Sequence, residues 1–229
     1  MRHVIALILL SCLAATAARG ETYDGSPLLA PYPHQIQDGH VIPMTGYHQQ
    51  QEWTCGPAAC LMIEKFYFPA STLDEPQIAT LVTCSETLGT GLAGMKTFFS
   101  RPGWTLLVKE ETDVNVVLRA IRKDVPTIVG WSDWGGHWAI PVGYDYRTKK
   151  DDFWQDDLII FRDPYDQVDG TVDGYTDFAL ARFTLMWEEH TYITPGRKNV
   201  RLLLIPVPAA PAAHPESAKA ASGILNATD

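Results

Sequence analysis

A cysteine stands where a polar run gives way to an apolar helical pattern. The polar run ends at Cys55-Gly56-Pro57. The residues that then recur at the spacing of one helix face are Cys55, Ala58, Ala59, Met62, Ile63 and Phe66. The free N–H groups and the positive dipole end in the first turn of a helix favour an anionic thiolate. Cys55 is therefore a candidate nucleophile, which would need a base and a group that orients the base.

His137 is the candidate base. It lies in Trp134-Gly135-Gly136-His137-Trp138, at the start of an apolar run that predicts a central strand. The two glycines let another backbone approach, and a rigid strand can hold the imidazole against a helix N-terminus. His48 is closer to Cys55 in sequence, but it lies in a loop without an obvious orienting group. A structural histidine is the alternative interpretation of His137.

Asp163 is the candidate for orienting the base. It ends an apolar, strand-like run, and Pro164 follows it directly. If this strand pairs antiparallel with the one that starts at His137, the carboxylate can accept a hydrogen bond from the imidazole. The alternative is an aspartate that only begins a turn before proline. Asp133 and Asp145 are weaker candidates for the same role.

Amide hydrolysis by a thiol also needs donors for an oxyanion. The backbone N–H of Cys55 can be one donor, and an upstream side-chain amide can be the other. Gln49, Gln50 and Gln51 all offer such an amide, and residue chemistry alone does not choose between them.

Together these motifs resemble the papain-like double-glycine (bacteriocin-processing) cysteine peptidase family and its stand-alone extracellular members. The resemblance covers about residues 41–205. Its site residues, in chain order, are Gln49, Cys55 with Gly56-Pro57-Ala58-Ala59, Gly136-His137-Trp138-Ala139 and Asp163-Pro164. It implies that Gln49 is the oxyanion donor and Cys55 the nucleophile. It further implies that His137 is the base and acid and that Asp163 orients it.

The resemblance implies an α+β, papain-like fold, with N-terminal helices and the nucleophile helix packed on an antiparallel sheet. The helices-then-strands order of the sequence independently favours an α+β class. The expected activity is cleavage of a peptide or protein substrate without a cofactor or metal. Candidate cleft residues are Trp53, Trp134, Gly135, Gly136 and Trp138, although Trp138 could equally belong to the core.

Three other functions remain open from the sequence. The same site could transfer an acyl group, as in transpeptidation or transglutamination, or cleave a cell-wall amide. The chain could also be a catalytically silent binding module. A metal site formed by Cys55, Cys60 and His137 is disfavoured, because the two cysteines are not spaced as a two-ligand clamp.

Composition and the N-terminus suggest an exported protein. The 229 residues carry 18 Lys and Arg against 27 Asp and Glu, a net charge of −9, which argues against a nucleic acid partner. Residues 1–17 read as a signal peptide with a basic start, an apolar core and a small-residue cleavage site. We expect a secreted or periplasmic monomer without a membrane span, and do not expect lipid anchoring at Cys12.

The domain organisation follows from composition. Residues 18–40 form an extended lead-in, 41–205 the peptidase domain, and 206–229 a disordered Pro/Ala-rich tail. The expected helices are 56–66, 72–83, 90–99, 112–121 and 176–187, and the expected strands are 41–44, 104–108, 126–131, 137–144, 157–162, 191–194 and 200–205. With Cys55 free, Cys60 and Cys84 are the candidate disulfide, the alternative being two buried apolar thiols.

Overall fold

The computed structural model describes residues 24–147, 156–168, 170–188, 201–209 and 213–226. The expected signal peptide with Cys12 and the strand expected at 191–194 lie outside these residues. None of the helices in the described ranges combines the length and the apolar character needed to cross a membrane.

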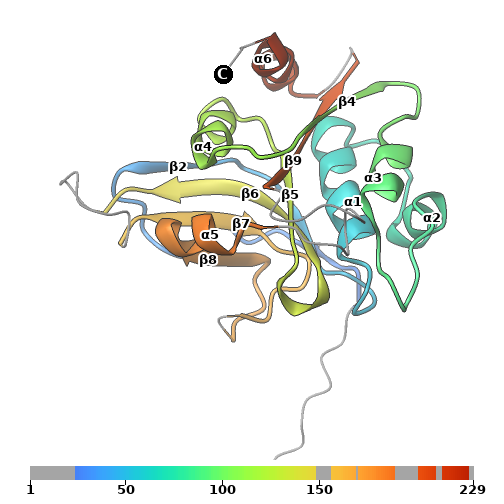
Figure 1. Ribbon diagram of the computed structural model, residues 1–229, viewed down its shortest axis with the longest axis horizontal. Coiled ribbons are helices and arrows are strands. Elements are labelled where there is room, and N and C mark those ends of the chain that lie inside the picture. The colour runs from blue at the N-terminus through green and yellow to red at the C-terminus, as the bar shows by residue number, and fades with distance from the viewer. Residues whose placement is uncertain (1–23, 148–155, 169, 189–200, 210–212, 227–229) are drawn as a thin grey trace, which may run out of the picture.

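Three consecutive helices precede six of the seven strands of the main sheet in the described residues, so the predicted α+β class is confirmed. Figure 1 shows the first three helices grouped on one side of the molecule and the strands β6, β7 and β8 on the other. The helices are α1 (Cys55–Tyr67), α2 (Glu75–Leu81), α3 (Leu92–Phe98), α4 (Val114–Ile121), α5 (Leu180–Met186) and α6 (Pro215–Asn226), with a short 3₁₀ turn, η1, at Asp133–Gly135.

Within the described ranges, seven strands form one antiparallel sheet. Its order is β4 (Trp104–Lys109), β9 (Leu202–Pro208), β5 (Ile128–Trp131), β6 (His137–Asp145), β7 (Leu158–Arg162) and β8 (Tyr175–Ala179), and β2 (Gly39–Val41) pairs with the far end of β6. A separate pair joins β1 (Pro27–Leu28) to β3 (Gly46–Tyr47). All of β5 and nearly all of β6 are buried at consecutive positions, which explains their continuous apolar sequences.

The nucleophile helix α1 packs on β6, as predicted. Its third residue is Pro57, which is tolerated because the first-turn N–H groups have no partner within the helix. Gly56 is required by packing, since a Cβ atom there would lie 2.7 Å from Cβ of Thr90. The loop before α3 thus lies directly against the first turn of α1.

Several expected element boundaries were wrong. The strand expected at 41–44 is instead β2, which covers Gly39–Val41 because it pairs with the far end of β6. Residues 176–179 were expected to begin a helix, but they form β8, where all five residues from Tyr175 to Ala179 pair with β7. Cross-strand pairing therefore overrides the local capping signal. The helix expected from residue 72 begins later, at Glu75, because Asp74 caps α2 in a reciprocal capping box with Gln77.

The C-terminal region also differs from the expected disordered tail. Strand β9 extends to Pro208, and α6 covers Pro215–Asn226. Pro215 suits the first helical position, and the alanine-rich segment after it has high helix propensity. The helix packs on β9 and buries Ala221 and Ile224, so tertiary contact supplies what composition alone did not indicate.

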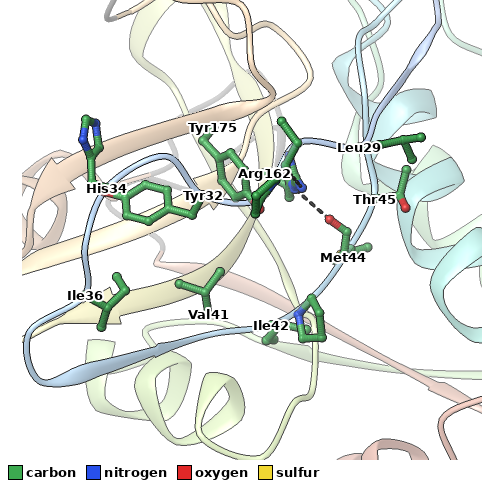
Figure 2. Close-up of a pocket in the computed structure, with 13 residues that line it drawn as sticks. Leu29, Tyr32, His34, Ile36, Val41, Ile42, Met44, Thr45, Arg162 and Tyr175 are labelled. Carbon is green, nitrogen blue, oxygen red and sulfur yellow. Dashed lines mark hydrogen bonds between the residues drawn. The ribbon is translucent and has the colours of Figure 1, made fainter.

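A buried arginine fixes the N-terminal segment to the sheet (Figure 2). The Arg162 guanidinium donates to the carbonyls of Met44 at 2.8 Å and Ala30 at 3.0 Å. It also lies 3.6 Å from the ring centroid of Tyr175, in a cation–π contact. Because Arg162 directly precedes Asp163, these contacts fix the course of the chain where the candidate orienting residue begins.

Candidate active site

Cys55 is the first residue of α1 and is 8% exposed. The preceding loop is closed by Thr54, whose hydroxyl accepts from the Gln51 N–H at 3.0 Å and donates to the Gln51 carbonyl at 2.9 Å. This closed turn holds the thiol at the N-terminus of the helix, where the dipole favours negative charge.

His137 is the first residue of β6, and its backbone pairs with that of Trp131 in β5. The imidazole packs edge-on against the Trp131 indole, with ring centroids 5.1 Å apart. Gly135 and Gly136 precede it with φ values of 87° and 100°, a region that favours glycine. The glycine pair thus turns the chain so that the strand begins with the imidazole in place.

The register of β6 and β7 brings Asp163 to His137. Ile140 pairs with Arg162, so the residue after β7 lies beside the start of β6. The Nε2–H of His137 donates to Oδ1 of Asp163 at 2.7 Å, and the side chains are 7% and 1% exposed. The same carboxylate oxygen accepts from the backbone N–H of Tyr165 at 2.9 Å. Asp163 is therefore held on two sides.

The two buried groups favour each other's charged form. Burial alone would lower the pKa of His137, but the Asp163 charge and hydrogen bond, together with Cys55, raise this pKa to about 10. Burial likewise acts to raise the pKa of Asp163, but the imidazole and the Tyr165 N–H outweigh it, so this pKa lies below its usual 3.8. The geometry favours an imidazolium–carboxylate pair.

The Cys55 side chain lies close enough to the His137 imidazole to help raise its pKa, and both residues line one cavity. Because Nε2 of the imidazole is engaged by Asp163, Nδ1 is the nitrogen left for Cys55. The structure thus brings together the three residues that the sequence predicted as nucleophile, base and orienting group. The weaker candidates lie elsewhere: Asp145 accepts from the backbones of Gln37 and Asp38, and the Asp133 side chain is exposed.

Gln49 is fully buried in the loop before Cys55. Its Nε2 donates to the Gln51 carbonyl at 2.7 Å, which uses one of its two amide hydrogens. Its backbone N–H donates to the Pro164 carbonyl at 2.9 Å, next to Asp163. His48, expected to lack an orienting group, is also buried, and its Nε2 lies 3.3 Å from the Tyr165 carbonyl.

A buried carboxylate that the sequence analysis missed supports this loop. Glu75, 1% exposed, accepts the backbone N–H of Gln50 at 2.8 Å. Burial raises the pKa of Glu75, and the nearby Thr54 hydroxyl and the hydrogen bond from the Gln50 N–H partly offset this. In the sequence, Glu75 could be recognised only as an acidic residue at the start of a helix. Nothing in the sequence indicates that this helix lies against the loop before Cys55.

Two cavities meet at Cys55. One, of about 300 Å³, is lined by Trp53, Glu86, Thr90, Gly135, Gly136 and Trp138, among others. The other, of about 510 Å³, is lined by Gly136, His137, Tyr165, Gln167 and Val168. Cys55, Glu52 and Gly136 line both.

Four of the predicted cleft residues line the smaller cavity. They are Trp53, Gly135, Gly136 and Trp138. Trp138 is both a cavity residue and a core residue. It lines the cavity, yet it is 1% exposed, and its indole N–H donates to the Thr90 carbonyl at 2.7 Å. The side chain of Trp134 lies outside the described part of the structure. Glu52, which contacts both cavities, carried no signal in the sequence beyond its position three residues before Cys55.

The expected disulfide is not formed: Cys60 and Cys84 are free thiols. Cys60 lies inside α1 and faces the Met95 sulfur at 3.7 Å, whereas the Cys84 thiol donates to the Trp53 carbonyl at 3.3 Å. Burial raises the pKa of both thiols, that of Cys60 well above its usual value. Within the described ranges, no three His, Cys, Asp or Glu side chains gather as a metal site.

Comparison with known proteins gives a match in structure alone. No protein-family model matches the chain. No curated protein matches it either. Among solved structures, the peptidase domain of Streptococcus ComA, a bi-functional ABC transporter involved in a quorum-sensing pathway, is 17% identical with a TM-score of 0.49. That match covers 71% of this chain and 96% of the ComA domain.

A second solved structure gives a similar result. It is a double-glycine motif protease from an AMS/PCAT transporter in complex with the leader peptide, 13% identical with a TM-score of 0.48. That match covers 74% of this chain and 95% of the protease. These values describe a likeness in fold.

Proposed function

We propose that this chain is an exported cysteine peptidase that hydrolyses peptide bonds through Cys55, His137, Asp163 and Gln49. The observation that carries the proposal is the placement of Cys55 beside the buried His137 imidazole, which is hydrogen-bonded to the Asp163 carboxylate. A thiol, a base and an orienting group in this order are the parts that nucleophilic amide cleavage requires.

The first half of the reaction forms a thioester. His137 holds the Cys55 proton as the imidazolium, and the Cys55 thiolate attacks the amide carbonyl carbon. The negative charge on the carbonyl oxygen is stabilised by the Cys55 backbone N–H and the second amide hydrogen of Gln49. As the C–N bond breaks, His137 returns the proton to the leaving nitrogen, and Asp163 holds the imidazolium between the two transfers.

The second half releases the acyl group. His137 takes a proton from water, and the resulting hydroxide attacks the thioester carbonyl. The C–S bond then breaks, and the proton passes from His137 to the Cys55 sulfur. The products are a carboxylic acid and the regenerated thiol.

The experiment compares wild type, Cys55→Ala and the matched control Cys60→Ala. We expect Cys55→Ala to abolish peptide cleavage and iodoacetamide labelling at neutral pH, and the Cys60→Ala variant to keep both. Full residual cleavage by Cys55→Ala would overturn the proposal. Cys55 left unlabelled in folded wild type would instead favour the binding-module alternative.

Acyl transfer is the second candidate function. The cavity beside His137, of about 510 Å³, has room for an acceptor larger than water on the side from which the thioester is attacked. An added primary amine would then compete with water for the same thioester. Product analysis by mass spectrometry with and without the amine distinguishes an acid product from an amide product.

A further inference from the structure

The two cavities at Cys55 take different parts of a substrate. His137 must deliver a proton to the leaving nitrogen, so the leaving part lies in the cavity that His137 lines. The other cavity, of about 300 Å³, then receives the acyl part and is called the acyl-side cavity here. Gly135 and Gly136 on its wall leave the backbone of the protein open to a close approach by the substrate.

The acyl-side cavity is acidic. Glu86, from the loop before α3, lines this cavity alone, and Glu52, from the loop before α1, lines both cavities. Within the described residues neither carboxylate has a hydrogen-bond or ion-pair partner. The part of its lining that the structure describes contains no Lys or Arg. A cationic group that enters therefore meets two carboxylates whose charge is not already neutralised.

Another wall of the cavity also suits a cation. Trp53 lines it, and aromatic rings attract ammonium and guanidinium groups. Thr90 lines it too, but its side chain is buried against Gly56 and near the Cys84 thiol.

We propose, resting on the peptidase function above, that the acyl-side cavity selects peptides with Lys or Arg on the acyl side of the cleaved bond. Glu52 and Glu86 are then the specificity-determining residues. A glutamate at the same peptide position is repelled, and a glutamine gains no charge attraction.

Binding is measured first, in the Cys55→Ala protein, so that it does not depend on catalysis. The probes are fluorescent hexapeptides, alanine and glycine apart from one central Arg, Gln or Glu. One exposed charge pair is worth up to about fivefold in affinity. With two carboxylates in the cavity, we expect the Arg peptide to bind about tenfold more tightly than the Gln peptide. This preference should shrink in concentrated salt.

Charge-removing variants then locate the preference. We expect Glu52→Gln with Glu86→Gln to abolish it, and Glu216→Gln, an exposed carboxylate on α6, to leave it intact. Equal binding of the three peptides, or a preference that survives the double substitution, would overturn the inference. Tighter binding of a leucine peptide than of the Arg peptide would also overturn it, by assigning the cavity to apolar residues.

Cleavage of the same peptides by the protein with Cys55 intact separates this inference from the proposed function. Charge-selective binding without cleavage of any peptide would refute the peptidase and leave the cavity assignment standing. Cleavage of all the peptides at equal rates, without charge-selective binding, would refute the cavity assignment and leave the peptidase function standing.

Discussion

The backbone N–H of Gln49 donates to the carbonyl of Pro164 at 2.9 Å. One partner belongs to the loop before the nucleophile and the other directly follows Asp163. The bond thus joins the side of the site that carries Cys55 to the side that carries the His137–Asp163 pair. It also fixes the main chain of Gln49, whose side-chain amide is in turn held by the Gln51 carbonyl.

Gln49→Ala should lower kcat by about 10²- to 10³-fold, because it removes one of two proposed oxyanion donors. Iodoacetamide labelling of Cys55 should be unchanged, since no oxyanion forms in that reaction. Steady-state kinetics and labelling rates measure the two effects. Gln51→Ala is the control, because the Gln51 side chain is exposed and its bonds within the loop are made by its backbone. Equal losses in both variants would reassign Gln49 to a structural role.

Asp163→Asn should lower kcat by about 10²- to 10⁴-fold, because the imidazolium loses its buried partner. Asp133→Asn is the matched control, an exposed aspartate that was a weaker candidate for the same role. Steady-state kinetics of both variants test the assignment. Similar activity of Asp163→Asn and wild type would remove Asp163 from the site.

The same pair should make stability depend on pH. The raised pKa of His137 contributes stability that is complete below its unfolded value of 6.5 and is lost as pH rises through about 10. The lowered pKa of Asp163 contributes stability that is present above 3.8 and is lost as pH falls through the lower folded value. Urea unfolding should therefore show the largest difference between wild type and Asp163→Asn at about pH 5. A difference that does not vary with pH would contradict the charged pair.

Glu75→Ala should lower the free energy of unfolding by about 1–3 kcal/mol, since it leaves the Gln50 N–H without its acceptor. It should also lower activity, because the loop before Cys55 loses its support. Glu75→Gln keeps the acceptor oxygen and removes only the charge, so it should stay close to wild type. Urea unfolding and kinetics of the two variants test this. A Glu75→Gln variant as impaired as Glu75→Ala would show that the charge itself is needed.

Reducing agent should leave the thermal unfolding temperature unchanged, because Cys60 and Cys84 are free and have other partners. A disulfide would instead stabilise the native state by about 2–4 kcal/mol. Calorimetry with and without dithiothreitol tests the prediction, and peptide mapping under non-reducing conditions is its control. A mapped Cys60–Cys84 bridge would restore the expectation from the sequence.

Elements with strong periodic patterns were predictable from the sequence. The helix that begins at Cys55 and the strand that begins at His137 were expected close to their observed bounds. Their apolar patterns reflect burial, and burial decides secondary structure in the core. The placement of Asp163 beside His137 followed from treating two consecutive strands as antiparallel neighbours, which they are.

Features that depend on distant contacts were not predictable. Strand β8 has a mixed sequence and exists because it pairs with β7. The support of the nucleophile loop by Glu75 requires knowing where α2 lies, and the acidity of the acyl-side cavity requires two separate loops to meet. Cysteine counting failed for the reason that spacing along the chain does not show which way thiols point.

Cys55 belongs to a helix and His137 to a strand, and the packing of α1 on β6 joins them. Their separation is therefore a property of the boundary between two layers. Warming that loosens this boundary pulls the thiol from the imidazole while the helix and the sheet still keep their own hydrogen bonds. We therefore expect activity to be lost at a lower temperature than the one at which the helix and the sheet unfold. The rate of turnover would then report how tightly α1 packs on β6.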